Sequence, residues 1–149
     1  MAERYDDQVM LERFLPGREF TVGVLGDRAL AVGEIIPHNT VFDYECKYQP
    51  GMTEEVFPAD IDDDVRDRLQ HQALEAHRVL GLRDFSRVDF KEDNQGTPRC
   101  LEVNTLPGLT SASLLPKSAA AVGISFKDLC DAICSMVLAR SLSWNKDYP

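Results

Sequence analysis

The run FSRVDFK at residues 85–91 and the run RCLEVN at residues 99–104 decide the fold of this chain. Both runs are rich in β-forming residues, and the turn-forming sequence NQGTP at residues 94–98 lies between them, which predicts a β-hairpin. Side chains alternate along each strand: Ser86, Val88 and Phe90 with Arg87, Asp89 and Lys91, then Leu101 and Val103 with Cys100, Glu102 and Asn104. The hairpin is therefore expected to have one apolar face and one polar face.

Pairing that is symmetric about the turn would place Asp89 opposite Glu102, and Arg87 opposite Asn104. Like charges facing each other across a sheet are destabilising, so a positive charge is expected near the two carboxylates. The residues alone leave two sources open. One is a solvated polar face that Arg87 and Lys91 neutralise. The other is a divalent cation bound to the oxygens of Asp89, Glu102 and Asn104, since Mg²⁺ and Mn²⁺ prefer carboxylate and amide ligands.

The sequence before this hairpin predicts further strands and a loop. FTVGVL at residues 20–25 and LAVGEII at residues 30–36 are joined through Gly26-Asp27, which predicts another hairpin. The run from Val9 to Leu15 is interpreted as a short strand that stops at Pro16-Gly17. Residues His38 to Met52 have neither helical nor alternating periodicity, so we expect a long loop there.

Two helices are expected. Apolar residues recur at steps of three and four from Val65 to Leu80, with Gly81 just past the end, and the aspartates before them are interpreted as capping residues. After a long loop from Thr105 to Pro116 and an Ala-rich stretch, Ser125 begins the last helix. Too little helix lies between the early strands for a doubly wound sheet, so the fold class is α+β, a mostly antiparallel sheet flanked by helices.

Composition narrows the function classes. The 149 residues fit one domain, and 16 Lys and Arg against 25 Asp and Glu give a net charge of −9. A surface of that sign repels phosphate backbones and anionic lipids, so neither nucleic-acid nor membrane binding is expected. The N-terminal sequence lacks the features of a signal peptide, and the four cysteines show no metal-binding spacing and are expected to be reduced. These features favour a cytoplasmic protein.

In this order, the segments resemble the C-terminal half of a bacterial D-alanine–D-alanine ligase of the ATP-grasp superfamily. The resemblance extends from Val9 to about Val137, through PGREFTVGVLGD, FDYECKY, FPAD, SRVDF, LEVNTLPGLTSASLLPK and GISF. It implies the C-terminal portion of an ATP-grasp fold and an ATP-dependent condensation of two D-alanines for peptidoglycan precursors. The carboxylate of the first D-alanine would be phosphorylated, and the amine of the second would attack the acyl phosphate.

The resemblance also implies roles for individual residues. Asp89, Glu102 and Asn104 would bind Mg²⁺ or Mn²⁺, with two ions expected, and join them to the ATP phosphates. Arg87 and the backbone N–H of Gly108 would stabilise the tetrahedral oxyanion, and Ser113 and Leu114 would bind the carboxylate of the second D-alanine. Lys47 would contact the phosphates from a closing loop that Tyr48 helps to order. Glu12, Phe14 and Leu15 would line the nucleotide pocket, with Glu12 and Leu15 at the adenine, and Glu19 would contact the ribose.

A complete ligase of this kind has roughly twice this length. Residues 1–149 are therefore expected to form a single partial ATP-grasp domain that lacks the N-terminal domain and part of the central domain. Two alternatives to a working ligase stay open: a module that binds Mg-nucleotide without turnover, and a fragment that forms a homodimer or pairs with the missing half. FDYECKY resembles the dipeptide-forming type of closing loop, which favours D-alanine over D-lactate or D-serine as the acceptor.

Overall fold

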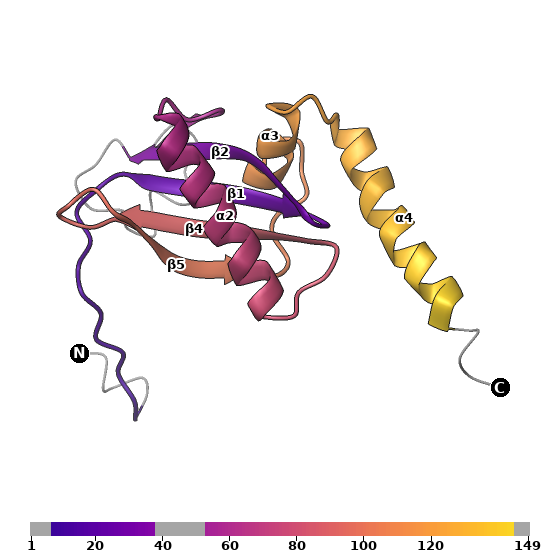
Figure 1. Cartoon of the computed structure of the whole chain (residues 1–149), viewed down its shortest axis with the longest axis horizontal. Helices are drawn as coiled ribbons and strands as arrows, with labels where there is room; N and C mark the ends of the chain where they lie inside the picture. The colour runs from indigo at the N-terminus through magenta and orange to yellow at the C-terminus, as the bar shows by residue number, and fades with distance from the viewer. Residues whose placement is uncertain (1–6, 38–52, 145–149) are drawn as a thin grey trace.

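The structure, a computed structural model, describes residues 7–37 and 53–144 and contains a five-stranded antiparallel sheet. Its strands are β1 (Glu19–Leu25), β2 (Arg28–Pro37), β3 (Thr53–Val56), β4 (Phe85–Glu92) and β5 (Pro98–Asn104), in the spatial order β3-β2-β1-β4-β5 (Figure 1). Both predicted hairpins, β1–β2 and β4–β5, are confirmed. The α+β fold with an antiparallel sheet is confirmed as well.

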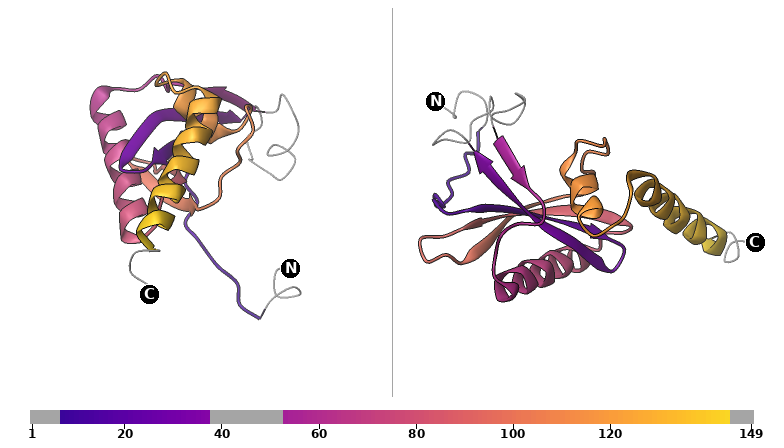
Figure 2. Two further views of the ribbon diagram at one scale, coloured as in Figure 1. Left: turned by 90° about the vertical axis from the view of Figure 1, so that its right-hand side faces the viewer. Right: turned by 90° about the horizontal axis from the view of Figure 1, so that it is seen from above.

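Helices cover both faces of this sheet. The helix α2 (Asp63–Val79) lies against one face and the short helix α3 (Leu114–Ala120) against the other, as the right-hand view of Figure 2 shows. The last helix, α4 (Phe126–Trp144), packs beside α3 at the end of the sheet. Within the described residues, none of the helices is both long and apolar enough to span a membrane.

A bulge in β2 changes which apolar side chains of this strand face each side of the sheet. Val32 pairs with Val22, but Ala29 pairs with Val24, so β2 holds one residue more than β1 over this interval. Ala29 and Val32 consequently pack in the α2-side cluster, whereas Leu30 packs in the α3-side cluster. The first cluster is formed by Phe20, Val22, Val24, Val32, Leu69, Ala73, Val88 and Phe90, and the second by Leu30, Leu115, Ala119 and Leu129.

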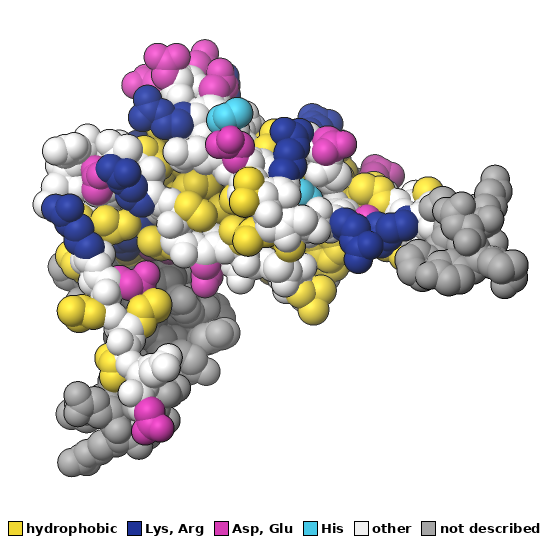
Figure 3. Space-filling view, turned by 60° about the horizontal axis from the view of Figure 1, so that its bottom comes forward, with side chains coloured by type: hydrophobic (Ala, Val, Ile, Leu, Met, Phe, Trp, Pro, Cys, Tyr) yellow, Lys and Arg dark blue, Asp and Glu magenta, His cyan; other side chains and the backbone are white. Residues whose placement is uncertain are grey.

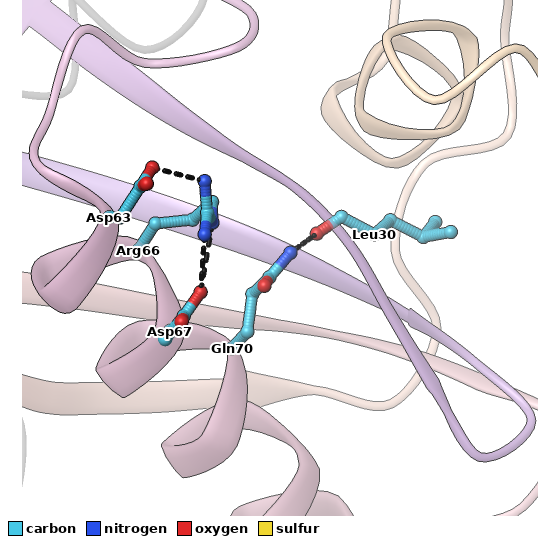
Figure 4. Close-up of polar contacts among 5 residues, drawn as sticks. All are labelled: Leu30, Asp63, Arg66, Asp67 and Gln70. Atoms are coloured by element: carbon cyan, nitrogen blue, oxygen red, sulfur yellow. Dashed lines mark hydrogen bonds and ion pairs between the residues drawn. The ribbon is translucent and has the colours of Figure 1, made fainter.

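The helix α2 begins where the sequence predicted, but its start is stabilised differently. Asp62 occupies the N-cap position without a side-chain capping hydrogen bond, so the capping interpretation is wrong for this residue. The negative charges of the first-turn acids still stabilise the helix by interacting with its dipole. Arg66 lies between the carboxylates of Asp63 and Asp67 (Figure 4). On the same helix, Gln70 donates a 2.8 Å hydrogen bond to the Leu30 carbonyl and so ties α2 to β2.

Two sequence predictions about loops and strands are wrong. Val9 to Leu15 form no strand: backbone pairing with Glu92 begins only at Gly17. The apolar side chains of this segment are exposed up to Phe14, and Leu15 is half-buried (Figure 3). The loop predicted from Thr105 to Pro116 ends earlier, because α3 begins at Leu114. Pro116 fits the first turn of a helix, where a backbone N–H has no intrahelical partner. The long loop predicted at His38 to Met52 lies outside the described residues.

Candidate functional site

Polar residues of β1, β4 and β5 form one surface on the sheet face opposite α2. The register places Thr21 beside Asp89, and Asp89 beside Glu102, while Arg87 pairs with Asn104. This pairing is the one that the symmetric hairpin predicted. We call the set Thr21, Arg87, Asp89, Glu102 and Asn104 the polar surface. The register shifts just beyond Asp89, so the regular alternation predicted for the remainder of β5 is interrupted.

Asp89 is the centre of the polar surface. Its Oδ1 accepts hydrogen bonds from Thr21 Oγ1 at 2.7 Å and from Arg87 Nε at 2.9 Å. Its Oδ2 accepts from Arg87 Nη2 at 2.8 Å and from Asn104 Nδ2 at 2.9 Å. The hydrogen bond to Asp89 raises the pKa of Arg87 despite the burial of its guanidinium. Side chains of this ion pair are 17% and 15% exposed, so it is screened less than a surface pair.

Lys91 and Asn104 differ in how they interact with the two carboxylates. Lys91 does not join the two carboxylates but pairs with Glu19 at 3.1 Å. Of the two cations that the solvated-face alternative invoked, only Arg87 contacts these carboxylates, and it does so in a largely buried ion pair. Glu102 Oε1 accepts a longer, 3.2 Å hydrogen bond from Asn104 Nδ2. The amide of Asn104 thus bridges both carboxylates, and Glu102 carries the charge on this surface that Arg87 does not hydrogen-bond.

This donor set suits a hard divalent cation that also binds a ligand from elsewhere. Among residues 7–37 and 53–144, no three His, Cys, Asp or Glu side chains are grouped to hold a metal by themselves. Two carboxylates and an amide are instead the partial set that Mg²⁺ typically uses when substrate phosphates and water complete its coordination. The residues present therefore fit Mg²⁺ or Mn²⁺ bound together with a phosphate group.

The helix α3 brings the predicted carboxylate-binding residues to the same face. A Cβ at Gly23 would lie 2.7 Å from Leu115 Cδ1, so the glycine allows α3 to pack closely on β1. Ser113 precedes α3, and a Cβ at Gly108 would lie 2.8 Å from Ser113 Oγ, so these two residues are in contact. Ser113 Oγ also accepts a hydrogen bond from the Thr110 backbone at 3.2 Å. Gly108, Ser113 and Leu114 thus lie together in the segment that follows Asn104.

A cavity of about 810 Å³ gathers most of the predicted nucleotide-binding residues. It is lined by Glu12, Arg13, Phe14, Leu15, Lys91, Asp93, Arg99, Cys100 and Leu101. Glu19 is not among the lining residues but contacts the cavity through its ion pair with Lys91. Hydrogen bonds from the backbone of Gln95 and Thr97, and then from Arg99, lower the pKa of Asp93.

Sequence reasoning missed Arg99, Cys100 and Leu101 as cavity residues. They follow Pro98 at the start of β5. They line the same cavity as Phe14 and Leu15 because the N-terminal segment meets this end of the hairpin through the backbone hydrogen bond between Gly17 and Glu92. The sequence signal available was their place in the hairpin that also carries Glu102 and Asn104. Lys47 and Tyr48 lie outside the described residues, so the structure does not locate the predicted closing loop.

Comparisons with known proteins agree with this geometry. Residues 1–135 match the family model "D-ala D-ala ligase C-terminus". A D-alanine–D-alanine ligase of Gluconobacter oxydans is 48% identical over 141 residues, which cover 92% of this chain and 46% of the relative. The solved structure of the Bacillus anthracis D-alanine–D-alanine ligase complexed with ATP is 34% identical, with a TM-score of 0.73 over 86% of this chain and 42% of that one.

A third similar protein differs in its named acceptor. The VanG D-Ala:D-Ser ligase of Enterococcus faecalis is also 34% identical, with a TM-score of 0.73 over 84% of this chain and 37% of that one. The chain thus spans about half the length or less of the relatives it matches. The family model covers most of the chain and the site residues lie within it, so the chain belongs to the D-alanine–D-alanine ligase family, whose C-terminal part it matches.

Proposed function

We propose that this chain forms the C-terminal part of an ATP-dependent D-alanine–D-alanine ligase that makes peptidoglycan precursors. The observation that carries the proposal is the cross-strand pair of Asp89 and Glu102, bridged by Asn104 and flanked by Arg87. In this proposal the chain is one part of an ATP-grasp site, and D-alanine and ATP are the substrates. The ATP complex of the Bacillus anthracis relative supports the nucleotide.

The proposed mechanism uses the polar surface in two ways. Asp89, Glu102 and Asn104 would hold Mg²⁺ or Mn²⁺, which neutralises charge on the transferring phosphoryl group. The Arg87 guanidinium offers rigid, charged N–H donors to the oxyanion that forms when the second amino acid attacks. Its two bonds to Asp89 use Nε–H and one N–H of Nη2, so the remaining N–H groups of the guanidinium are the donors for this role.

The remaining roles follow the order of the segments. The Gly108 N–H would donate to the same oxyanion, and Ser113 with Leu114 would bind the carboxylate of the second D-alanine. Glu12, Phe14 and Leu15 would hold the nucleotide in the cavity beside β5, with Glu19 at the ribose. Lys47 and Tyr48 would close over the phosphates and exclude water. The proposal includes a cytoplasmic location, which the free thiols of Cys100, Cys130 and Cys134 support.

ADP release from Mg-ATP, with and without D-alanine, tests the ligase activity of the 149-residue chain. If the 149 residues suffice for the reaction, D-alanine stimulates ADP release and the dipeptide forms, and D-alanine outcompetes D-lactate and D-serine at neutral pH. If the D-serine product dominated, the proposed acceptor would be wrong, and the acceptor would be the one named for the D-Ala:D-Ser relative. A rate of ADP release that is the same with and without each of the three acceptors would contradict the ligase reaction.

A second candidate is binding of Mg-nucleotide without turnover. It is favoured by the length of the match, since the chain spans 46% of the Gluconobacter oxydans ligase and 42% of the Bacillus anthracis ligase, so the 149 residues supply only part of the ATP-grasp cleft. Calorimetry would then detect Mg-ATP binding while ADP release stays at background. Light scattering in the same samples tests self-association or pairing through exposed apolar side chains: a mass that rises with concentration supports it, and a strict monomer contradicts it.

A further inference from the structure

Thr21 is the buried member of the polar surface and has no role in the mechanism described above. It occupies the middle of β1, the central strand, where it pairs with Asp89 on one side and Gly33 on the other. Its side chain is 1% exposed, and its Oγ1 donates the 2.7 Å hydrogen bond to Asp89 Oδ1. A buried hydroxyl is costly unless it finds a partner, and a valine would suit this strand position equally well in shape. Packing alone therefore does not explain the hydroxyl of Thr21, and its hydrogen bond to Asp89 does.

Asp89 has no free acceptor position for a cation in the described arrangement. An ionised carboxylate offers about four lone-pair sites. Thr21, Arg87 and Asn104 supply four hydrogen bonds to it, two on each oxygen. A cation can bind this carboxylate only if at least one donor leaves.

The three donor residues differ in their freedom to leave. Thr21 is short, β-branched and stiff at χ1, and it is fixed in the central strand. Asn104 bonds to both carboxylates at once, which ties it to the surface. Arg87 reaches Asp89 on a long side chain that many rotamers can turn away. Arg87 is therefore the donor that yields, and Thr21 is the one that stays.

We propose that Thr21 is a positioning residue for the divalent-cation site. Its hydroxyl holds Asp89 Oδ1 against β1, so that the carboxylate keeps its place beside Glu102 when Arg87 gives up its bonds. This inference rests on the proposed function, in which Asp89 is a ligand of Mg²⁺ or Mn²⁺. It explains why a central, fully buried strand position carries a hydroxyl where an aliphatic side chain would pack.

The affinity of the full chain for Mn²⁺ tests this role, because electron paramagnetic resonance of free Mn²⁺ reads binding without any turnover. Thr21→Val keeps the shape and removes the donor, and we expect it to weaken Mn²⁺ binding about tenfold, as loss of a partner behind a metal ligand commonly does. Thr21→Ser keeps the hydroxyl and is expected to stay within about threefold of the original affinity. Equal weakening in both variants would overturn the proposal, as would no weakening in Thr21→Val.

Ser118→Ala is the matched control for losing a buried hydroxyl. Ser118 is 1% exposed, and its Oγ donates to the Ala31 carbonyl at 2.6 Å instead of to a carboxylate. Ser118→Ala is expected to lower the urea midpoint but leave Mn²⁺ affinity unchanged. If it weakened Mn²⁺ binding as much as Thr21→Val does, a general loss of packing would replace the proposed role. Should Thr21→Val not fold, Thr21→Cys, whose thiol is a weak donor, carries the same expectation.

Asp89→Asn separates this inference from the proposed function. If Asp89→Asn weakens Mn²⁺ binding while Thr21→Val does not, the cation site stands and the role of Thr21 fails. If Asp89→Asn leaves Mn²⁺ affinity unchanged, the proposed cation site itself fails.

Discussion

Arg87 compensates the two facing carboxylates unequally. Asp89 accepts two hydrogen bonds from Arg87 in a bidentate pair, whereas Glu102 interacts with Arg87 only through the attraction between their charges. The carboxylate that a cation can approach without displacing the arginine is therefore Glu102. At the scale of single residues, this asymmetry makes Glu102 the more informative position for testing metal binding.

Glu102→Gln is expected to abolish metal-dependent nucleotide binding. The substitution keeps the size of the side chain and removes one negative charge from a set with only two carboxylates, so the affinity for Mg-ATP should fall by about tenfold or more, to that for ATP without the metal. Calorimetric titration of Mg-ATP measures the effect. Glu75→Gln is the matched control, because Glu75 lies on α2, which covers the opposite face of the sheet, and should leave binding unchanged. Unaltered Mg-ATP affinity in Glu102→Gln would contradict its role as a ligand.

At the scale of elements, predictability depended on whether a pattern is local. The alternation in β4 and β5 specified which side chains share a face, and the structure confirms the pairs Asp89–Glu102 and Arg87–Asn104. The sequence could not show the bulge in β2, because an extra residue is compensated by packing on the two faces and not by its neighbours in sequence. Likewise, α3 is too short for a periodic signal, and it forms because Leu115 and Ala119 are buried against the sheet.

Contacts between elements also explain a glycine in β2. Gly33 pairs with Thr21, and a Cβ there would lie 2.2 Å from Phe57 Cε1, so the Phe57 ring rests on the glycine. Gly33→Ala should reduce the free energy of unfolding by about 1–3 kcal/mol, the usual cost of overpacking. Urea unfolding measures this change.

A second substitution tests the physical reason for that loss. Phe57→Leu shortens the overlapping side chain, so its combination with Gly33→Ala should cost less than the sum of the two single changes. Strict additivity would show that the overlap with Phe57 is not the cause, and an unchanged midpoint in Gly33→Ala would contradict the close contact itself.

At the scale of the whole molecule, the sheet separates two layers with different tasks. The polar surface and α3 occupy one face, while α2 and most large apolar side chains fill the other. His77 on α2 and Ser86 on β4 connect the second layer to the strand that carries Arg87 and Asp89, through a 2.7 Å hydrogen bond between His77 Nδ1 and Ser86 Oγ. Because this contact is buried in the core, its state affects the stability of the folded chain.

Stability is expected to fall as the pH drops below about 6.5, because of His77. Burial lowers the pKa of His77 from its ordinary value of 6.5, and the repulsion from Arg78 acts in the same direction, while Asp27 and Asp84 oppose it. Below the unfolded pKa the unfolded chain binds a proton that the folded chain does not, so the free energy of unfolding decreases until the pH reaches the lowered folded pKa. Each unit between the two pKa values contributes about 1.4 kcal/mol to the free energy of unfolding.

Urea unfolding at pH 7.5, 6.5 and 5.5 should show this fall in stability. The fall should be smaller in His77→Gln than in His71→Gln, which changes the exposed histidine of the same helix. The same slope in both variants would show that another group controls the pH dependence.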